Sequence, residues 1–173
     1  MIIEIIGPAG AGKSTLAKAV LERVENARLG TFPSFRKAEN FLFYVRNSLP
    51  VLPAMLQACF GAKGGYPSSH LMVSMALLNG WHRQLKRQAV NENSLILLDQ
   101  GPVFMLAALS IFGPGVIMSK MYAGWRDRAF RCWAETLDGV IWLDAALPSL
   151  VERIRGRVIW HGVKDKTDAD AYQ

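Results

Sequence analysis

Eight residues near the N-terminus constrain this chain more than any other feature: Gly7-Pro8-Ala9-Gly10-Ala11-Gly12-Lys13-Ser14. They match the pattern G-x-x-x-x-G-K-[ST], in which glycines let the backbone curl until successive N–H groups point inward. The short β-branched run before them, Ile2–Ile6, is typical of a buried strand. Four apolar residues then recur at helical spacing: Leu16, Ala19, Val20 and Val24. A strand, a glycine turn and a helix in this order predict a loop that binds phosphate groups.

Each residue of this loop has an expected role toward ATP or a similar nucleoside triphosphate. Lys13 is expected to reach the β- and γ-phosphates, and Ser14 to give its hydroxyl oxygen to Mg²⁺. Thr15 is placed to hydrogen-bond the α-phosphate, and the positive N-terminal end of the helix adds attraction for anions. The residues expected to contact the nucleotide are Gly7, Ala9, Gly10, Ala11, Gly12, Lys13, Ser14 and Thr15.

Hydrophobic strands alternate with longer helices along the rest of the chain. We expect further strands at 29–32 (a weak signal), 94–99 and 140–144, and helices at 35–60, 71–90, 118–137 and 148–155. This alternation predicts an α/β fold in which a parallel sheet is flanked by helices on both faces. No internal repeat or long linker interrupts it, so we expect a single domain over residues 1–173.

The composition limits the classes of partner. Lys and Arg outnumber Asp and Glu by 20 to 14, which favours an anionic partner, and the phosphate loop makes phosphorylated small molecules the first choice. No nucleic-acid reading module is recognisable, so no nucleic acid is expected.

Cys59 and Cys132 lack metal or disulfide spacing and indicate reduced thiols in a cytoplasmic protein.

A stretch without charge, 100–119, has the length of a membrane span. Gly113-Pro114-Gly115 breaks it, and it follows directly after a predicted strand. We therefore expect a buried helix–turn–helix here and no membrane association.

Asp99 is the carboxylate expected beside the γ-phosphate, as a ligand of Mg²⁺ or as the base that deprotonates an attacking hydroxyl. It closes the apolar run 95–98, and ligands of open α/β sheets bind at the carboxyl ends of strands. A turn-forming Asp that caps the next helix is the alternative. Asp144 ends the last predicted strand in the same way but is more typical of a turn or cap.

Taken together, these residues resemble the P-loop kinases that phosphorylate nucleosides, nucleotides and other small molecules. The loop through Thr15 is similar to the thymidylate kinase form. The segment 143–157 resembles the final strand, the final helix and the entry to the lid in that group. The segment 98–101 occupies the place of the group's Asp-Arg or Asp-Gly element. The resemblance implies a five-stranded parallel sheet, a mobile lid and an acceptor site after strands two and three. Gln100 stands where thymidylate kinases carry arginine, and no pattern here supplies the last helix and strand, so we expect a fragment or a small sheet.

The lid is expected near 153–166. Arg153 and Arg157 are four residues apart and share one face of a helix that continues that far. Cations that close over a triphosphate stabilise charge on the transferred group and exclude water, so both arginines are candidate catalytic residues. The alternative is a solvated basic tail.

Two clusters could receive the acceptor, since an aromatic base or ring can stack beside a guanidinium. The first follows the second predicted strand and contains Phe32, Phe35, Arg36, Phe41, Phe43, Tyr44 and Arg46; the second contains Arg126, Arg128 and Arg131. The alternative for each aromatic residue is a place in the core, which is also the expectation for Met75 and His82. A homodimer is left open.

The sequence thus favours an ATP-dependent kinase that transfers the γ-phosphate to a nucleotide, a nucleoside or a related metabolite. The alternative is a nucleotide-dependent switch or regulatory ATPase that acts through protein contacts. A GTPase is disfavoured, because 99–102 does not match D-x-x-G and 163–166 does not match N-K-x-D. ATP-driven nucleic-acid processing has only the net charge in its favour.

Overall fold

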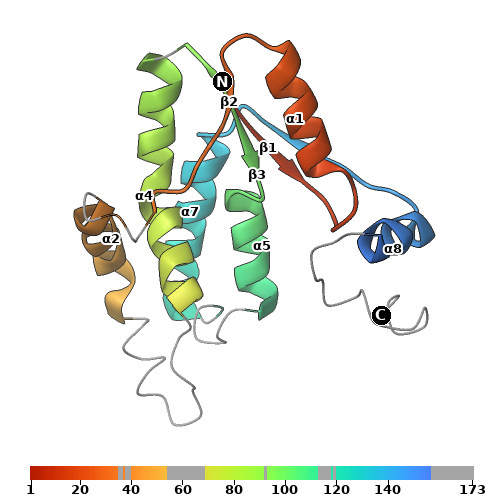
Figure 1. Cartoon of the computed structure of the whole chain (residues 1–173). Coiled ribbons are helices and arrows are strands. Elements are labelled where there is room, and N and C mark those ends of the chain that lie inside the picture. The colour runs from red at the N-terminus through yellow and green to blue at the C-terminus, as the bar shows by residue number, and fades with distance from the viewer. Residues whose placement is uncertain are drawn as a thin grey trace.

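The computed structural model describes residues 1–34, 37, 40–53, 69–91, 93–112, 118 and 120–156. Its centre is a four-stranded sheet in which every neighbouring pair is parallel, in the order β2-β3-β1-β4. The strands are β1 (Ile2–Ile6), β2 (Ala27–Leu29), β3 (Leu95–Asp99) and β4 (Gly139–Trp142). Figure 1 shows the strands at the centre of the molecule with the helices around them.

The helices follow the strands in alternation along the chain. They are α1 (Lys13–Arg23), α2 (Phe41–Ser48), α4 (Ser69–Asn91), α5 (Pro102–Phe112), α7 (Ala123–Ala134) and α8 (Leu147–Arg155). Two single 3₁₀ turns, η2 (Leu49–Val51) and η3 (Lys120–Tyr122), adjoin α2 and α7. Within the described ranges, no helix is both long enough and apolar enough to cross a bilayer.

Helices cover both faces of the sheet, with α1 on one side and α4, α5 and α7 on the other (Figure 1). The parallel register places Ile2 beside Ile96 and Glu4 beside Leu98, so these side chains share the face that meets α4 and α5. Ile5 lies on the opposite face and is fully buried, as is Ala17 of α1. The predicted three-layer α/β arrangement is therefore confirmed.

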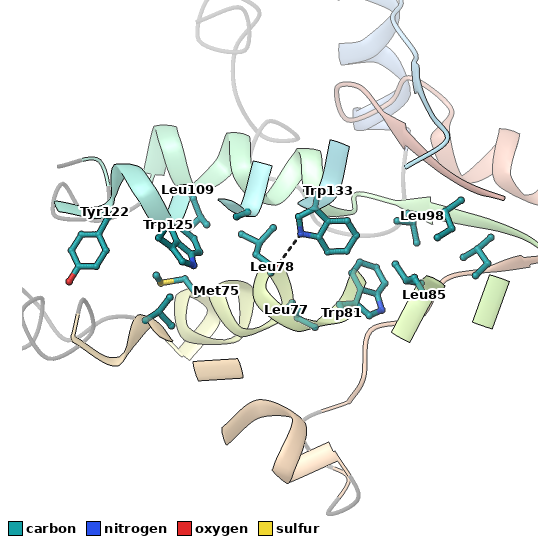
Figure 2. Close-up of a cluster of buried hydrophobic side chains, with 14 residues drawn as sticks. Met75, Leu77, Leu78, Trp81, Leu85, Leu98, Leu109, Tyr122, Trp125 and Trp133 are labelled. Atoms are coloured by element: carbon teal, nitrogen blue, oxygen red, sulfur yellow. Dashed lines mark hydrogen bonds between the residues drawn. The ribbon is translucent and has the colours of Figure 1, made fainter. Parts of the chain in front are cut away.

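The main core lies between the sheet and helices α4 and α7. Trp81 and Trp133 pack with their ring centroids 5.8 Å apart, and the indole N–H of Trp133 donates to the carbonyl of Leu78 at 3.0 Å. Figure 2 shows the cluster continuing from Leu98 of the sheet along both helices to Tyr122. Met75 is buried in it, as the sequence predicts. This long core packs α4 and α7 together on one side of the sheet.

The last strand differs from expectation. The sequence predicts a buried strand at 140–144, but β4 ends at Trp142, whose side chain is 66% exposed, and Val140 and Ile141 are also exposed. The reason is its position, because among the described strands β4 pairs with β1 alone and lies at the edge. The resemblance also implied five strands, whereas the described part of the chain contains four.

Smaller differences concern element ends. The weak strand expected at 29–32 is β2, which ends at Leu29; only the Gly30 N–H continues the pairing, donating to Leu97 at 2.8 Å. The helix expected at 35–60 is shorter in the described part, where α2 begins at Phe41 and gives way to η2 at Leu49. Residues 54–60 and the break at 113–115 lie outside the described residues.

Gly80 allows α2 to lie close against α4, and its replacement tests this contact. A Cβ on Gly80 would overlap the side-chain amide of Asn47, which is buried. We expect Gly80→Ala to lower the free energy of unfolding by about 1–3 kcal/mol, since overpacking outweighs the better helix propensity of alanine. Urea unfolding followed by tryptophan fluorescence measures the change.

Gly124→Ala is the matched control, because Gly124 lies in α7 and a Cβ there meets nothing within 4 Å. We expect this variant to be neutral or slightly more stable than the parent. An equal loss of stability in both variants would contradict the close contact at Gly80.

Candidate phosphate-binding site

The loop between β1 and α1 has the backbone that its glycines permit. Gly7, Gly10 and Gly12 have φ values of 144°, 86° and 94°, a region that residues with a Cβ rarely adopt. Gly12 directly precedes α1, and its carbonyl accepts the first helical hydrogen bond from Leu16 at 2.9 Å. The loop therefore ends at a helix N-terminus, where unpaired amides and the helix dipole favour an anion.

The loop is held from one side by the segment that follows β4. Gly7 lies so close to Leu143 that a Cβ would overlap the Leu143 carbonyl, and a Cβ on Gly10 would lie 3.0 Å from the carbonyl oxygen of Leu150. The N–H of Leu143 donates to Ile6 at 2.8 Å, directly before the loop. Glycine is thus required at positions 7 and 10 by packing as well as by φ.

Lys13 lies against the loop itself. Its side chain is 7% exposed, and the ammonium donates to the carbonyls of Gly7 at 2.8 Å and Pro8 at 2.9 Å. These bonds hold a positive charge at the turn whose amides are expected to meet phosphate. They also mean that Lys13 stabilises the local conformation of the loop.

Ser14 and Asp99 are in direct contact. The Ser14 hydroxyl donates to Oδ2 of Asp99 at 2.8 Å, which joins the first turn of α1 to the last residue of β3. The second oxygen of Asp99, Oδ1, is buried and has no hydrogen-bond partner in the described part of the protein. A hydroxyl beside a carboxylate with an unused oxygen fits Mg²⁺, which prefers oxygen ligands and takes few of them from the protein.

The described residues contain no group of three or more His, Cys, Asp or Glu side chains that could hold a metal ion. An all-protein metal cage is therefore absent from this part of the chain. Ser14 and Asp99 are the residues that would hold Mg²⁺, with phosphate and water oxygens completing the coordination.

The chain turns sharply after Asp99. Gln100 has φ 60°, a left-handed conformation that is uncommon for a residue other than glycine, and α5 begins two residues later at Pro102. Gly101 leaves room for Glu4, since a Cβ on it would lie 3.1 Å from the Glu4 carboxyl carbon. Gln100, the departure from the thymidylate kinase pattern, is exposed at this turn.

Glu4 of β1 supports the turn after Asp99. It was not among the predicted site residues. It is fully buried, and its two carboxylate oxygens accept from the N–H groups of Val103 at 2.9 Å and Phe104 at 3.1 Å. Burial raises the pKa of Glu4, although hydrogen bonds from the first turn of α5 act in the opposite direction. The sequence feature that could have indicated this role is that Glu4 is a single charged residue inside the apolar run of β1.

Arg153 is the predicted lid residue that the structure describes. Its guanidinium donates to the carbonyl of Gly10 at 3.2 Å, so α8 brings a cation to the loop. It also lines an open hollow of about 540 Å³, together with Gly10, Ala11, Gly12, Thr15, Leu16, Ala19 and Leu143. Arg157 and the rest of the lid at 157–166 lie outside the described residues.

Other candidates lie elsewhere. Asp144 accepts from the next N–H, that of Ala145, at 2.8 Å, as in a turn. Phe32 contacts the core residue Trp81 with ring centroids 4.5 Å apart. Cys132 is a half-buried free thiol, whereas Phe35, Arg36 and Cys59 lie outside the described residues. Phe32, Phe35 and Arg36 therefore do not show where an acceptor would bind.

Comparison with known proteins gives a fold similarity only. No family model matches the sequence, and no curated protein matches it. A structure of deoxyadenosine kinase from M. mycoides with bound dATP has a TM-score of 0.44 and 21% identity, covering 91% of this chain and 72% of that one. The same enzyme with products dCMP and a flexible dCDP bound has a TM-score of 0.45 and 17% identity, covering 99% and 78%. At these values the similarity does not identify a reaction.

Replacing Glu4 tests its support of the turn after Asp99. Glutamine offers one acceptor oxygen to two backbone N–H groups, so we expect Glu4→Gln to lower the free energy of unfolding by about 1–3 kcal/mol. The raised pKa means that the stabilisation from Glu4 is fully present below its unfolded pKa and is lost as the pH rises through the folded pKa. The deficit of Glu4→Gln should therefore be larger near about pH 5 than near about pH 8.

Urea unfolding at the two pH values measures this difference. Glu22→Gln serves as the control, because Glu22 is exposed on α1. A deficit for Glu4→Gln that grows with rising pH would contradict the assigned direction.

Proposed function

We propose that this protein binds ATP with Mg²⁺ at the loop 7–15 and transfers the γ-phosphate to a nucleotide, a nucleoside or a related small metabolite. The observation that carries the proposal is the contact between Ser14 and Asp99 at 2.8 Å. It places a hydroxyl and a carboxylate together at the carboxyl end of β3, beside a glycine loop that opens a helix. Phosphoryl transfer needs an anion cradle and oxygen ligands for a metal in this arrangement.

The chain's own residues account for binding. Backbone amides of the loop and the N-terminal end of α1 attract the phosphates without a full charge, and Lys13 adds one full charge at the loop. Ser14, and Asp99 where it acts as a metal ligand, would hold the Mg²⁺ ion, which would supply neutralisation of charge on the phosphates. Arg153, bonded to Gly10, adds a second positive charge beside the loop and stabilises negative charge there.

Asp99 is the residue we assign to the acceptor side. In the proposed step the acceptor oxygen forms a bond to the γ-phosphorus while the bond from this phosphorus to the bridging β–γ oxygen breaks, and ADP leaves. The proton of an acceptor hydroxyl passes to Asp99 or to solvent, and Oδ1 of Asp99 has no other partner among the described residues. Asp99 acts either as this base or as the ligand that orients the metal.

Lys13→Ala tests the nucleotide site. We expect it to remove detectable ATP binding, because it takes away the ammonium that is bonded to the loop carbonyls of Gly7 and Pro8. Calorimetric titration with Mg²⁺–ATP measures binding, and thermal unfolding reports the loss of the two loop hydrogen bonds. Lys18→Ala, on the exposed side of α1, should bind ATP normally. Unchanged ATP affinity in Lys13→Ala would defeat the loop assignment.

Asp99→Asn tests the transfer step. We expect ATP affinity within about tenfold of the parent and turnover lower by at least about 10², since an amide neither accepts the proton nor neutralises the metal. Turnover is measured in a screen of pooled nucleotides, nucleosides and sugars, read by ADP release and by the mass of the product. Normal turnover would remove Asp99 from the mechanism, and ADP release without any phosphorylated product would favour the switch or regulatory ATPase.

A further inference from the structure

A second hollow lies between α2, α4 and α7 and is lined by none of the residues of the phosphate loop. Its volume is about 460 Å³, and each of the three helices contributes an arginine to its lining: Arg46, Arg83 and Arg128. Among the residues that the structure describes, no aspartate or glutamate lines it. The two arginine-containing clusters that the sequence suggested for an acceptor, one around Arg46 and one around Arg128, thus meet at this place.

Two hydrogen bonds of the Asn79 side chain join the three helices around the hollow. Asn79 of α4 accepts from the indole N–H of Trp125 in α7 at 2.8 Å and donates to the carbonyl of Asn47 in α2 at 2.9 Å. Gly80 allows the close approach of Asn47 described above. Because these partly buried hydrogen bonds join α4 to both α2 and α7, they hold together the three helices that carry the arginines.

The polar groups around the hollow favour an anion. The three arginines are exposed, and Arg83 also donates to the carbonyl of Asn79 at 3.3 Å. Positive charges that line one hollow, with no carboxylate among its described lining residues, attract an anion. His82 also lines the hollow, and its Nδ1 is buried without a hydrogen-bond partner among the described residues. The ring of His82 is held edge-on by Trp133, with centroids 5.8 Å apart, so this unused nitrogen is fixed in place.

The remaining lining is apolar. Leu78, Trp125 and Ala129 line the hollow but are themselves buried, whereas Pro50 of η2 is exposed and Cys132 of α7 is half-buried. An apolar wall with a few convergent polar groups is the usual character of a small-molecule site, and the volume is in the usual range.

We propose that this hollow binds a small organic anion, a flat apolar ring that carries a phosphate or carboxylate group. The ring lies against Pro50 and Cys132, and the anionic group lies among Arg46, Arg83 and Arg128. The proposal does not depend on the kinase assignment, because the lining residues of the two sites do not overlap.

The test is a titration of the full chain with phenyl phosphate and with benzoate, followed by NMR of the Trp125 indole N–H and the His82 ring. We expect both signals to shift with saturation, and calorimetry to give the affinity. Arg128→Gln and Arg83→Gln should each weaken binding at least about fivefold, since each removes a charge-assisted hydrogen bond. The two probes distinguish a phosphate from a carboxylate ligand.

Matched controls separate a site from general charge attraction. Arg131→Gln on α7 and Arg87→Gln on α4 remove the same charge from the same helices, but neither residue lines the hollow. We expect both to bind within about twofold of the parent. The proposal would be overturned if these controls weakened binding equally, or if the Trp125 and His82 signals did not shift. It would also be overturned if Mg²⁺–ATP displaced phenyl phosphate, or if sedimentation showed that the parent is a dimer and that the arginine variants are monomers.

Discussion

The parallel pairing of β1 with both of its neighbours is the constraint on which the rest of the structure depends. In this register Ile5 lies beside Asp99 and Ile6 beside Trp142, so the loop that follows β1 has the end of β3 on one side and the start of the α8 segment on the other. Asp99 can then meet Ser14, and Arg153 can meet Gly10. A shift of one residue in the pairing of β1 with β3 would turn Asp99 to the other face of the sheet relative to β1, and it could then no longer meet Ser14.

Two charged groups are buried to maintain this arrangement, and each is satisfied by backbone. Lys13 donates to carbonyls of the loop, and Glu4 accepts from the first turn of α5. Lys13 fixes the loop that follows β1, and Glu4 fixes the turn between Asp99 and α5. Because an uncompensated buried charge is costly, neither residue can be lost without loosening the position of its partner element.

The sequence predicted those parts of the molecule that local patterns determine. The loop glycines, the strands around it and Asp99 at a strand end are visible because turn chemistry and β-branched runs act over a few residues. The exposure of Trp142 was not predictable, since an edge strand and a central strand have the same apolar pattern until the neighbours are known. Glu4 was missed for a related reason, because its partners lie about a hundred residues away along the chain.

The two proposed anion sites would attract their ligands through different groups. This difference helps to explain why the chain has more basic than acidic residues. The phosphate loop relies mainly on backbone amides and one buried ammonium, so it uses little of the formal charge of +6. The loop therefore accounts for only some of the surplus. Exposed arginines gathered from three helices account for more of it, and their attraction for an anion is screened by salt, whereas that of a buried lysine and fixed amides is screened much less.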